Sequence, residues 1–571
     1  MKRNLKYLIC ILLITFIISF KCGFDQKKKP KPKIHPIEQT HPNTKYRNLE
    51  SRQITIKVDY EVIQNKVSSA NFEKIKTAFE KAIGAFQAYL KISTSDTYSF
   101  TKAQIDEYKA DFTGDDVPEL IANSISWGDV ILVPVIDTSL GEGVDAAAYP
   151  LALDTKNKRP ILGCVCLGTH YDYSKTNAER YLGMLLLHEI SHVLAFNEQL
   201  FQYFINITNP TIEETVNGAT RKLLATPKVL YYARGHFGCP SLTGVELENQ
   251  GGDGSAGSHW EARIMVGDYM LSTDYPELVV SDITLAVFED SGWYTVNYYT
   301  GGLFKTGKGE GCNFLQRRCI INEKSYFPLD FCDNTDDEVC SPGHLDRGTC
   351  YLAKYSNIPS IYQYFDDPQI GGYSPADYCP ASMSYASSSG NYYLYSRCDS
   401  NGLQTLHDGL GEAFGQNSFF CFQSSLFNSS ASANVKSKYG NKLTARCYKV
   451  EHCDNATLSY DILIEGKDFG CEDATEEKTY DQITGSEGIT GEIVCPPYWR
   501  VCGGTQLCND PFECASASSE TTRLFTTQYV KNKTEYNPSL YSEIPKKPVK
   551  ANSGYVKICI SFILFLYILI I

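Results

Sequence analysis

The sequence has no excess of positive charge. Its 571 residues include 53 lysines and arginines against 66 aspartates and glutamates, a formal net charge of −13. Proteins that bind nucleic acid need a basic surface to neutralise phosphates, so we exclude nucleic acid as a partner. The one basic run, Lys27 to Lys33, is interrupted by prolines and is expected to be a solvated linker.

Apolar runs of the length needed to span a membrane are also lacking. The run Tyr7 to Phe20 has 14 residues and follows Lys2, Arg3 and Lys6. A membrane helix needs roughly 20 apolar residues, whereas a signal peptide needs fewer. Residues 1–20 are therefore predicted to be a signal peptide, with an uncleaved N-terminal anchor as the alternative.

The C-terminal tail has the same shortage. Ile558 to Ile571 supplies 14 apolar residues, directly after Lys557 and a cluster of small residues, Ala551 to Gly554. This arrangement predicts a glycosylphosphatidylinositol (GPI) attachment signal over residues 553–571, with a short transmembrane helix as the alternative. We expect a protein that enters the secretory pathway and stays at the cell surface, anchored to the membrane.

Cysteine pairs at zinc-finger spacing are absent, although the chain has 21 cysteines. Outside the signal, the tail and Cys22 there are 18, an even number that suits disulfides in an oxidising compartment. Fifteen lie between Cys312 and Cys514, and because 15 is odd, at least one bridge should leave that segment for Cys164, Cys166 or Cys239. The secretory route also makes four asparagines candidate glycosylation sites: Asn206, Asn428, Asn455 and Asn532.

Helical and alternating patterns mix over the first 300 residues. Apolar residues recur at helical spacing from Ser69 to Leu90, and residues 178–196 form a second apolar helix pattern. Three segments rich in β-branched residues predict strands at 53–62, 129–136 and 159–167.

The sequence His188-Glu189-Ile190-Ser191-His192 lies inside the second predicted helix. Histidines at positions i and i+4 share one helix face, so both imidazoles can bind a single Zn²⁺. Glu189 adjoins the first of them and is the candidate general base for a water that zinc activates. These residue types at this spacing predict a zinc-dependent peptidase.

Catalytic zinc usually takes three protein ligands, so a third is missing from this motif. The candidates from chemistry alone are Glu213 or Glu214, His236, and His259, which follows a glycine-rich stretch from Gly251. Glycines let a backbone approach a metal closely, which favours His259 over His236.

Three segments together resemble the leishmanolysin family of zinc peptidases, family M8 of the metzincin clan. They are GGDGSAGSHWEARIMVGDYM, ITLAVFEDSGWY from Ile283, and KRPILGCVCLG from Lys158, in an order and spacing that agree with the family over about residues 50–515. The resemblance implies that zinc is bound by His188, His192 and His259, with 66 residues between the second and third ligands. It implies that Met270 supports the zinc site from below without binding the metal. It also implies that Lys158 to Gly168 is an edge strand to which extended substrate adds.

The sequence departs from the family at two places. Ala195 stands where metzincins usually have glycine; if the turn there is left-handed, alanine costs roughly 1–2 kcal/mol. The family propeptide usually has a cysteine followed shortly by His-Asp, whereas this chain has Cys22-Gly23-Phe24-Asp25. Cys22 is a candidate zinc-blocking thiol, and a lipid-modified or incidental cysteine is the alternative.

The resemblance implies an α+β protein with a metzincin-type zinc peptidase domain, an inserted central segment and a disulfide-rich, loop-rich C-terminal domain. We expect a zinc endopeptidase acting on extracellular or surface proteins and peptides, with a catalytically inactive adhesion or coat protein as the alternative. The expected organisation is a signal peptide (1–20), a propeptide or linker (21–50), a catalytic subdomain with the histidine helix (51–196), a central subdomain with the third ligand and the methionine turn (197–300), a cysteine-rich domain (301–515), a stalk (516–552) and the anchor signal (553–571).

Overall fold

The computed structural model describes residues 51–502, Phe512 and two short N-terminal strands at 21–22 and 33–35. The signal peptide, the stalk, the C-terminal tail, Asn455 and Asn532 lie outside the described residues, and so does the side chain of Cys22. Within 51–502 the description leaves out 94–97, 99–127, 141–143, 170, 175–177, 217, 251–255, 274, 276–277, 299–303, 336–337, 385–395, 400–408, 416–417, 440–441, 455, 473–477 and 481–487.

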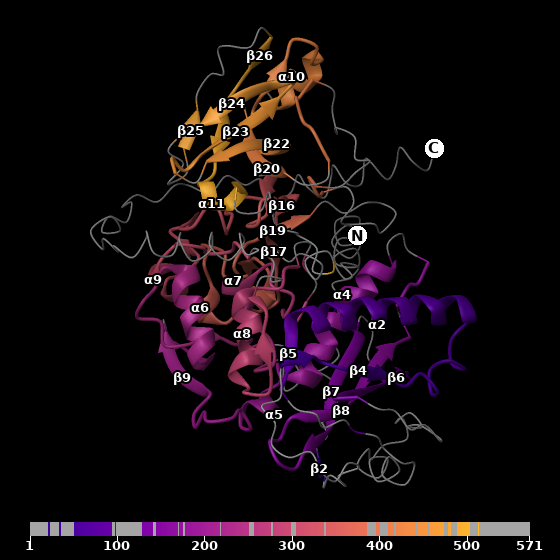
Figure 1. Ribbon diagram of the computed structural model, residues 1–571. Helices are drawn as coiled ribbons and strands as arrows, with labels where there is room; N and C mark the ends of the chain where they lie inside the picture. Colours follow the sequence, from indigo (N-terminus) through magenta and orange to yellow (C-terminus); the bar gives the residue numbers. More distant parts are fainter. Residues whose placement is uncertain are drawn as a thin grey trace, which may run out of the picture.

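One large sheet organises the first part of the chain (Figure 1). Its order is β1-β7-β8-β6-β4, and β2 also pairs with β7. Strands β4, β6 and β8 run parallel, whereas β7 is antiparallel to β8. The strands are β1 (Lys21–Cys22), β2 (Lys33–His35), β4 (Ile56–Val58), β6 (Val130–Asp137), β7 (Val144–Asp154) and β8 (Pro160–Gly168).

The expectation that Lys158 to Gly168 is an edge strand is wrong. Strand β8 lies inside the sheet, between β6 and β7. Beyond β7 only the short β1 and β2 follow, and both pair with it in parallel: Cys22 lies opposite Ala146, and Lys33 to His35 lie opposite Ala152 to Asp154. Among the strands of the folded core, β7 is therefore the outer one, and N-terminal residues occupy part of its free edge.

Both faces of this sheet are buried. Alternate residues of a strand point to opposite faces, so Val130 and Leu132 join the core beneath the helices, while Ile131 and Val133 join a second apolar cluster on the other side. The cysteines of β8, Cys164 and Cys166, lie in that second cluster as buried free thiols.

Two long helices cover one face of the sheet. Helix α2 (Ser69–Tyr89) is capped by the side chain of Ser68, one residue before the predicted start, which accepts a hydrogen bond from the Asn71 amide at 3.3 Å. Helix α4 (Ala178–Leu194) packs against α2, β7 and β8. A Cβ at Gly163 of β8 would lie 2.3 Å from Val193 Cγ1, so glycine there lets α4 approach the sheet. The predicted helices and the strands β6 and β8 are confirmed, whereas the predicted strand 53–62 divides into parts of two sheets.

The central part packs beside the large sheet and carries two small sheets, β11-β10-β9 and β12-β5-β3. Its helices α6 and α8 contact each other and bury apolar residues in the same core as α2 and α4. The elements are β3 (Arg52–Gln53), β5 (Leu90–Ile92), α5 (Glu198–Phe201), β9 (Thr211–Val216), β10 (Ala219–Leu224), α6 (Pro227–Phe237), β11 (Val245–Glu246), α7 (Ala262–Met265), α8 (Asp282–Asp290) and β12 (Thr295–Val296).

The cysteine-rich part begins with short elements that lie between the central part and a terminal sheet. They are α9 (Cys312–Gln316), β13 (Ile320–Ile321), β14 (Lys324–Ser325), β15 (Glu338–Cys340), β16 (Arg347–Cys350), β17 (Ala353–Lys354), η3 (Ser360–Tyr362), β18 (Ile370–Gly371), η4 (Ser374–Ala376) and β19 (Ser382–Ser384).

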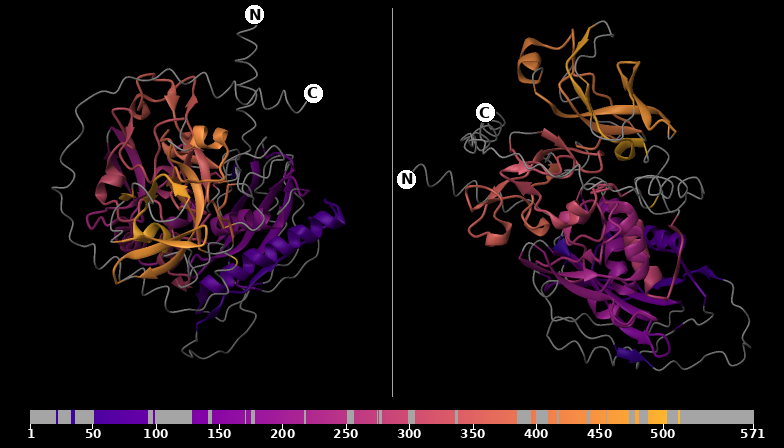
Figure 2. Two further views of the ribbon diagram at one scale, coloured as in Figure 1. Left: turned by 90° about the horizontal axis from the view of Figure 1, so that it is seen from above. Right: turned by 90° about the vertical axis from the view of Figure 1, so that its left-hand side faces the viewer.

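The terminal sheet has the order β24-β23-β22-β20-β27-β25 and lies at the opposite end of the molecule from the large sheet (Figure 2). Its strands, with the neighbouring elements, are β20 (Phe419–Ser424), β21 (Phe427–Asn428), α10 (Ala433–Tyr439), β22 (Thr444–Asp454), β23 (Ser459–Ile464), β24 (Lys467–Cys471), β25 (Lys478–Tyr480), β26 (Ile489–Thr490), β27 (Ile493–Cys495) and α11 (Tyr498–Val501).

Disulfides run through this second half of the chain. The prediction that one bridge leaves the cysteine-rich segment is confirmed, since Cys312 pairs with Cys239. The other bridges among the described residues are Cys319–Cys379, Cys332–Cys350, Cys340–Cys421, Cys398–Cys447, Cys453–Cys502 and Cys471–Cys495. In the described ranges, no helix combines the length and the apolar character that crossing a membrane requires.

Candidate metal centre

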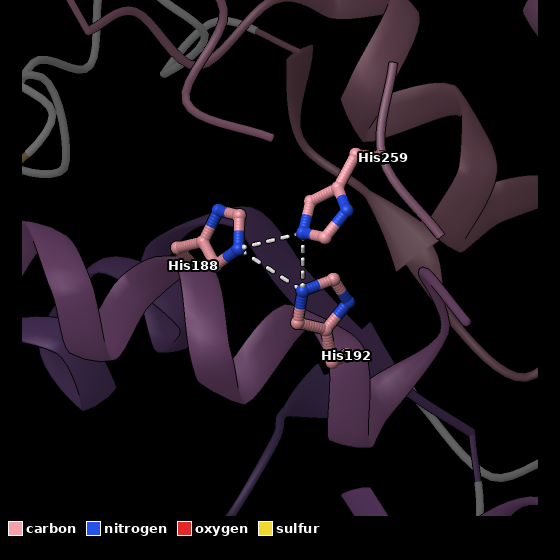
Figure 3. A group of neighbouring side chains, drawn as sticks. All are labelled: His188, His192 and His259. Atoms are coloured by element: carbon pink, nitrogen blue, oxygen red, sulfur yellow. Dashed lines mark hydrogen bonds between the residues drawn. The ribbon is translucent and has the colours of Figure 1, made fainter. Parts of the chain in front are cut away.

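Three histidines from distant parts of the chain meet at one point (Figure 3). His188 and His192 lie one turn apart on α4, and their Nε2 atoms are 3.0 Å apart. The Nε2 atom of His259 is 3.2 Å from each of them. All three side chains are buried, with exposed fractions of 3% or less.

His259 reaches the helix because its segment is held by backbone contacts on both sides. The His259 carbonyl accepts a hydrogen bond from the Glu248 amide at 2.9 Å, and the Trp260 amide donates to the Met270 carbonyl at 3.0 Å. Two residues earlier, Gly257 has a φ of +81°, a conformation that favours glycine. A Cβ there would also lie 2.9 Å from the Glu198 carboxylate. At least one glycine of the predicted glycine-rich approach, Gly257, is therefore favoured at its position for steric reasons.

Backbone carbonyls orient the two histidines of the helix. His188 Nδ1 donates to the carbonyl of Tyr269 at 2.8 Å, and His192 Nδ1 donates to the carbonyl of Phe196 at 2.7 Å. Because a carbonyl can only accept, each Nδ1 carries the proton and each Nε2 presents a lone pair. Two lone pairs that face each other at 3.0 Å repel, unless a cation lies between them.

The arrangement fits zinc. Tetrahedral ligand nitrogens at about 2.0–2.1 Å from zinc lie roughly 3.3 Å apart, close to the spacing of the three Nε2 atoms. Burial lowers the pKa of His188 to about 4, so its imidazole is neutral at physiological pH, as a metal ligand must be. These three residues could hold the metal.

The structure places the other predicted site residues as follows. Glu189 is fully buried beside His188 on α4, and Met270 is fully buried directly after Tyr269, whose carbonyl orients His188. The backbone of β1 places Cys22 on the outer side of β7.

The alternative third ligands lie elsewhere. The Nε2 atom of His236 donates to the Thr306 carbonyl at 2.8 Å, and its ring stacks on Phe304. Glu213 and Glu214 lie on β9, in a hairpin with β10, where Glu214 accepts a hydrogen bond from Thr243.

Ala195 needs no left-handed backbone. It is absent from the residues with positive φ, and its amide donates to the Ser191 carbonyl at 3.0 Å as α4 ends. The strain considered for alanine at this position therefore does not arise.

Sequence reasoning did not identify the residues that orient the histidines. Tyr269 supplies a carbonyl to His188, and its hydroxyl also contacts Ser191 at 2.8 Å. Asp268 accepts hydrogen bonds from the Met270 amide and the Thr284 hydroxyl, and burial raises its pKa to about 6. Their position directly before Met270 in the family motif was the one feature of the sequence that could have identified them. A backbone carbonyl that accepts a hydrogen bond leaves no pattern in the sequence.

Comparison with known proteins agrees with this geometry. The sequence model of the leishmanolysin family matches residues 76–508. The chain is 29% identical to a leishmanolysin homolog of Crithidia fasciculata over 369 residues, 61% of this chain and 51% of the relative. It is 27% identical to leishmanolysin of Leishmania major over 324 residues, 56% of this chain and 51% of the relative.

A third relative comes from an animal. The leishmanolysin-like peptidase of Drosophila melanogaster is 27% identical over 406 residues, 60% of this chain and 59% of the relative. The chain thus spans about half the length of the curated relatives it matches. The family match extends over most of the chain and includes the helix, the third histidine and the cysteine-rich part. The protein therefore belongs to the leishmanolysin family of zinc metallopeptidases.

Proposed function

We propose that this protein is a zinc endopeptidase that hydrolyses peptide bonds of extracellular or surface proteins. The observation that carries the proposal is the convergence of the three Nε2 atoms, at 3.0–3.2 Å, beside the buried carboxylate of Glu189. His188, His192 and His259 are proposed to bind the metal. Zinc bound there would supply a Lewis acid that polarises the peptide carbonyl and lowers the pKa of water.

Glu189 is proposed to act as the general base. Its carboxylate takes a proton from the attacking water and returns it to the leaving amine, so that one residue serves both proton transfers. The carbonyls of Tyr269 and Phe196 keep the His188 and His192 rings in the tautomer that presents Nε2. Met270, fully buried directly after Tyr269 in the chain, is proposed to support the rings by packing.

A Glu189→Gln variant tests the mechanism. Loss of the base should lower kcat on denatured casein by about 10²–10⁴-fold or more, while the zinc content stays at one per chain. Glu179→Gln is the matched control, since Glu179 lies on the first turn of the same helix. Casein cleavage by pure Glu189→Gln at the wild-type rate would refute the assigned role.

We propose that extended substrate adds to the free edge of β7, the outer strand of the core sheet. Added peptides gain backbone hydrogen bonds at such an edge. The same edge carries β1 and β2, so residues 21–50 are proposed to be a propeptide that competes with substrate. Cys22 is proposed to ligate the zinc as the blocking thiol. The metzincin type of fold and the subdomain boundaries at residues 196, 300 and 515 are proposed with this arrangement.

Removing residues 21–50 tests the propeptide. The shortened chain should cleave peptides faster than the full chain, and Cys22→Ser should raise the activity of the full chain by a smaller amount. Equal activity of the full and shortened chains would show that the N-terminal strands do not block the edge.

The disulfides suit an extracellular protein. We propose further that a signal peptide directs it to the secretory pathway and that a C-terminal lipid holds it at the cell surface. Phosphatidylinositol-specific phospholipase should release the protein from intact cells. Retention together with a C-terminal peptide that ends at Ile571 would favour a short transmembrane helix instead.

A further inference from the structure

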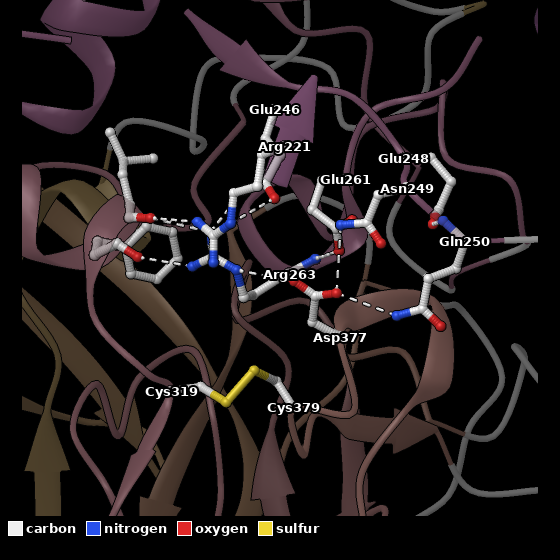
Figure 4. A network of polar contacts seen from close by, with 12 residues as sticks. Arg221, Glu246, Glu248, Asn249, Gln250, Glu261, Arg263, Cys319, Asp377 and Cys379 are labelled. Atoms are coloured by element: carbon white, nitrogen blue, oxygen red, sulfur yellow. Dashed lines mark hydrogen bonds and ion pairs between the residues drawn. A yellow bond between two sulfur atoms is a disulfide. The ribbon is translucent and has the colours of Figure 1, made fainter. Parts of the chain in front are cut away.

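Four carboxylates from separate parts of the chain are buried together, and one of them, Glu261, follows the third histidine by two residues (Figure 4). This acidic cluster consists of Glu246, Glu248, Glu261 and Asp377, each with an exposed fraction of 3% or less. Glu246 belongs to β11, Glu261 caps α7, and Asp377 ends η4 in the cysteine-rich part. The cluster thus joins the His259 segment to a loop that the Cys319–Cys379 disulfide fixes.

Two arginines lie in the cluster, and both form their short ion pairs with the same carboxylate, that of Glu246. Arg221 Nε lies 3.0 Å from Glu246 Oε1, and Arg263 Nη2 lies 2.8 Å from Glu246 Oε2. Their remaining contacts go largely to backbone: Arg263 donates to the carbonyls of Phe314 and Leu315, and Arg221 to that of Leu315. Asp377 Oδ2 lies 3.7 Å from Arg263 Nε, and Asp377 Oδ1 accepts hydrogen bonds from the side-chain amides of Gln250 at 3.1 Å and Asn249 at 3.5 Å.

The other carboxylates accept hydrogen bonds from neutral donors, but not at every oxygen. Glu248 accepts from the Gln250 amide at 2.8 Å and from the Ser272 hydroxyl at 3.3 Å. Glu261 Oε1 accepts from the Arg263 amide, whereas its Oε2 is buried and has no hydrogen-bond partner among the described residues. If all four carboxyl groups are ionised, two guanidinium groups leave a formal charge of −2 in a buried space, and burial accordingly raises the pKa of Glu248 to about 8. Either protons or a bound cation must neutralise this charge.

The geometry suits a hard divalent cation. One carboxylate oxygen from each of Glu246, Glu261 and Asp377 lies within 4.8 Å of the other two. Oxygens that ligate one Ca²⁺ at about 2.3–2.6 Å lie no more than about 5 Å apart, and calcium accepts irregular oxygen sets that also hold other contacts. Magnesium and zinc demand shorter bonds and stricter geometry.

We propose that Glu246, Glu261 and Asp377 form a structural calcium site, distinct from the histidine centre. Calcium there neutralises the cluster and completes the coordination of Glu261 Oε2. It ties the strand segment that carries His259 to the cysteine-rich part. The site does not depend on peptidase activity, so a failure of the proposed enzyme function would leave it intact.

Equilibrium dialysis with ⁴⁵Ca²⁺ on the full, zinc-saturated chain tests the proposal. We expect one high-affinity calcium per chain and a higher melting temperature in 1 mM calcium, with the zinc content unchanged. Glu261→Gln and Asp377→Asn should each weaken calcium binding by about tenfold or more, because affinity follows the number of charged ligands. Glu248→Gln is the matched control, since it removes a charge from the same cluster but none of the three converging oxygens.

A spectroscopic measurement needs no variant. The Tyr362 hydroxyl hydrogen-bonds to the Asp377 carboxylate, so this ring lies beside the proposed site. Terbium bound in place of calcium should therefore show tyrosine-sensitised emission that calcium displaces. Absence of bound calcium at millimolar concentration, or equal binding by wild type, Glu261→Gln and Asp377→Asn, would overturn the site. Equal weakening by Glu248→Gln would also overturn it, because attraction by net charge would then explain the binding.

Discussion

The two halves of this molecule are stabilised in different ways. Residues 51–237 bury both faces of a large sheet, one in the main apolar core beneath two long helices and the other in a second cluster, and their only cysteines, Cys164 and Cys166, are free thiols. Residues 312–502 add a few side chains to the main core, form two smaller apolar clusters among mostly short strands, and contain six disulfides among the described residues. Short strands bury too little apolar surface to stabilise a fold alone, so cross-links take over part of that role.

The comparison shows why the metal centre lies where it does. Helix α4 presents His188 and His192 from the main apolar core, where packing holds side chains in fixed positions. His259 arrives from the segment between the halves. Among its described residues the cross-linked half contributes no histidine to the centre, although its Asp377 belongs to the acidic cluster.

Reduction of the disulfides should have the largest effect, and it should destabilise the cross-linked half much more than the packed half. In dithiothreitol, the amides of β20 and β22 should lose protection from hydrogen exchange, while those of α2 and β6 keep most of theirs. Each bridge is worth about 2–4 kcal/mol, and losing several together exceeds the stability of an ordinary domain. Mass spectrometry of exchanged peptides measures this. Earlier loss of protection in α2 would show that the core depends on the bridges.

Phe79→Ala should have the next largest effect, in the packed half. Phe79 is fully buried on α2 and makes an edge-to-face contact with Tyr60. Removing a buried phenylalanine costs roughly 3–5 kcal/mol. Urea unfolding should show this loss with the disulfides intact. Phe72→Ala is the control on the same helix, since Phe72 is only half-buried, and its loss should be smaller.

Removing the bridge between the halves should cost somewhat less. The Cys239→Ala/Cys312→Ala double variant opens a link across 73 residues, and Cys332→Ala/Cys350→Ala opens one across 18. Both losses should fall within about 2–4 kcal/mol, with the longer loop near the upper end because its closure restricts the unfolded chain more. Thermal unfolding of the two variants side by side measures the difference. An equal or reversed order would show that local packing outweighs loop length.

Ala195→Gly should have the smallest effect. Since Ala195 has no left-handed backbone, glycine brings no relief of strain and adds freedom to the unfolded chain. We expect a loss of up to about 1 kcal/mol and no rise in kcat/KM. A clear gain in activity would mean that the end of α4 has to move during catalysis.

Local patterns were sufficient to predict much of the packed half. The helical spacing from Ser69 onward gave α2 and the apolar run around His188 gave α4, because these signals depend only on nearby residues. The odd cysteine count correctly required a bridge to an upstream cysteine, and the structure identifies Cys239.

The order of the strands in the sheet and the contacts between distant residues could not be predicted from local patterns. Strand β7 was missed because it is rich in alanine and contains Pro150, which weakens its local strand signal. Without β7, the position of β8 inside the sheet could not be inferred. The acidic cluster joins Glu246 to Asp377 across more than 100 residues, and only the folded chain brings such groups together.

The Cys239–Cys312 bridge closes a covalent ring that contains His259 and Met270. A single proteolytic cut between residues 240 and 258 would therefore leave His259 attached to the molecule through Cys312. The nicked chain would keep its third histidine at high effective concentration near His188 and His192. On a gel, the cut would become visible only after reduction. For the proposed peptidase, this ring means that one cut in the chain need not end activity.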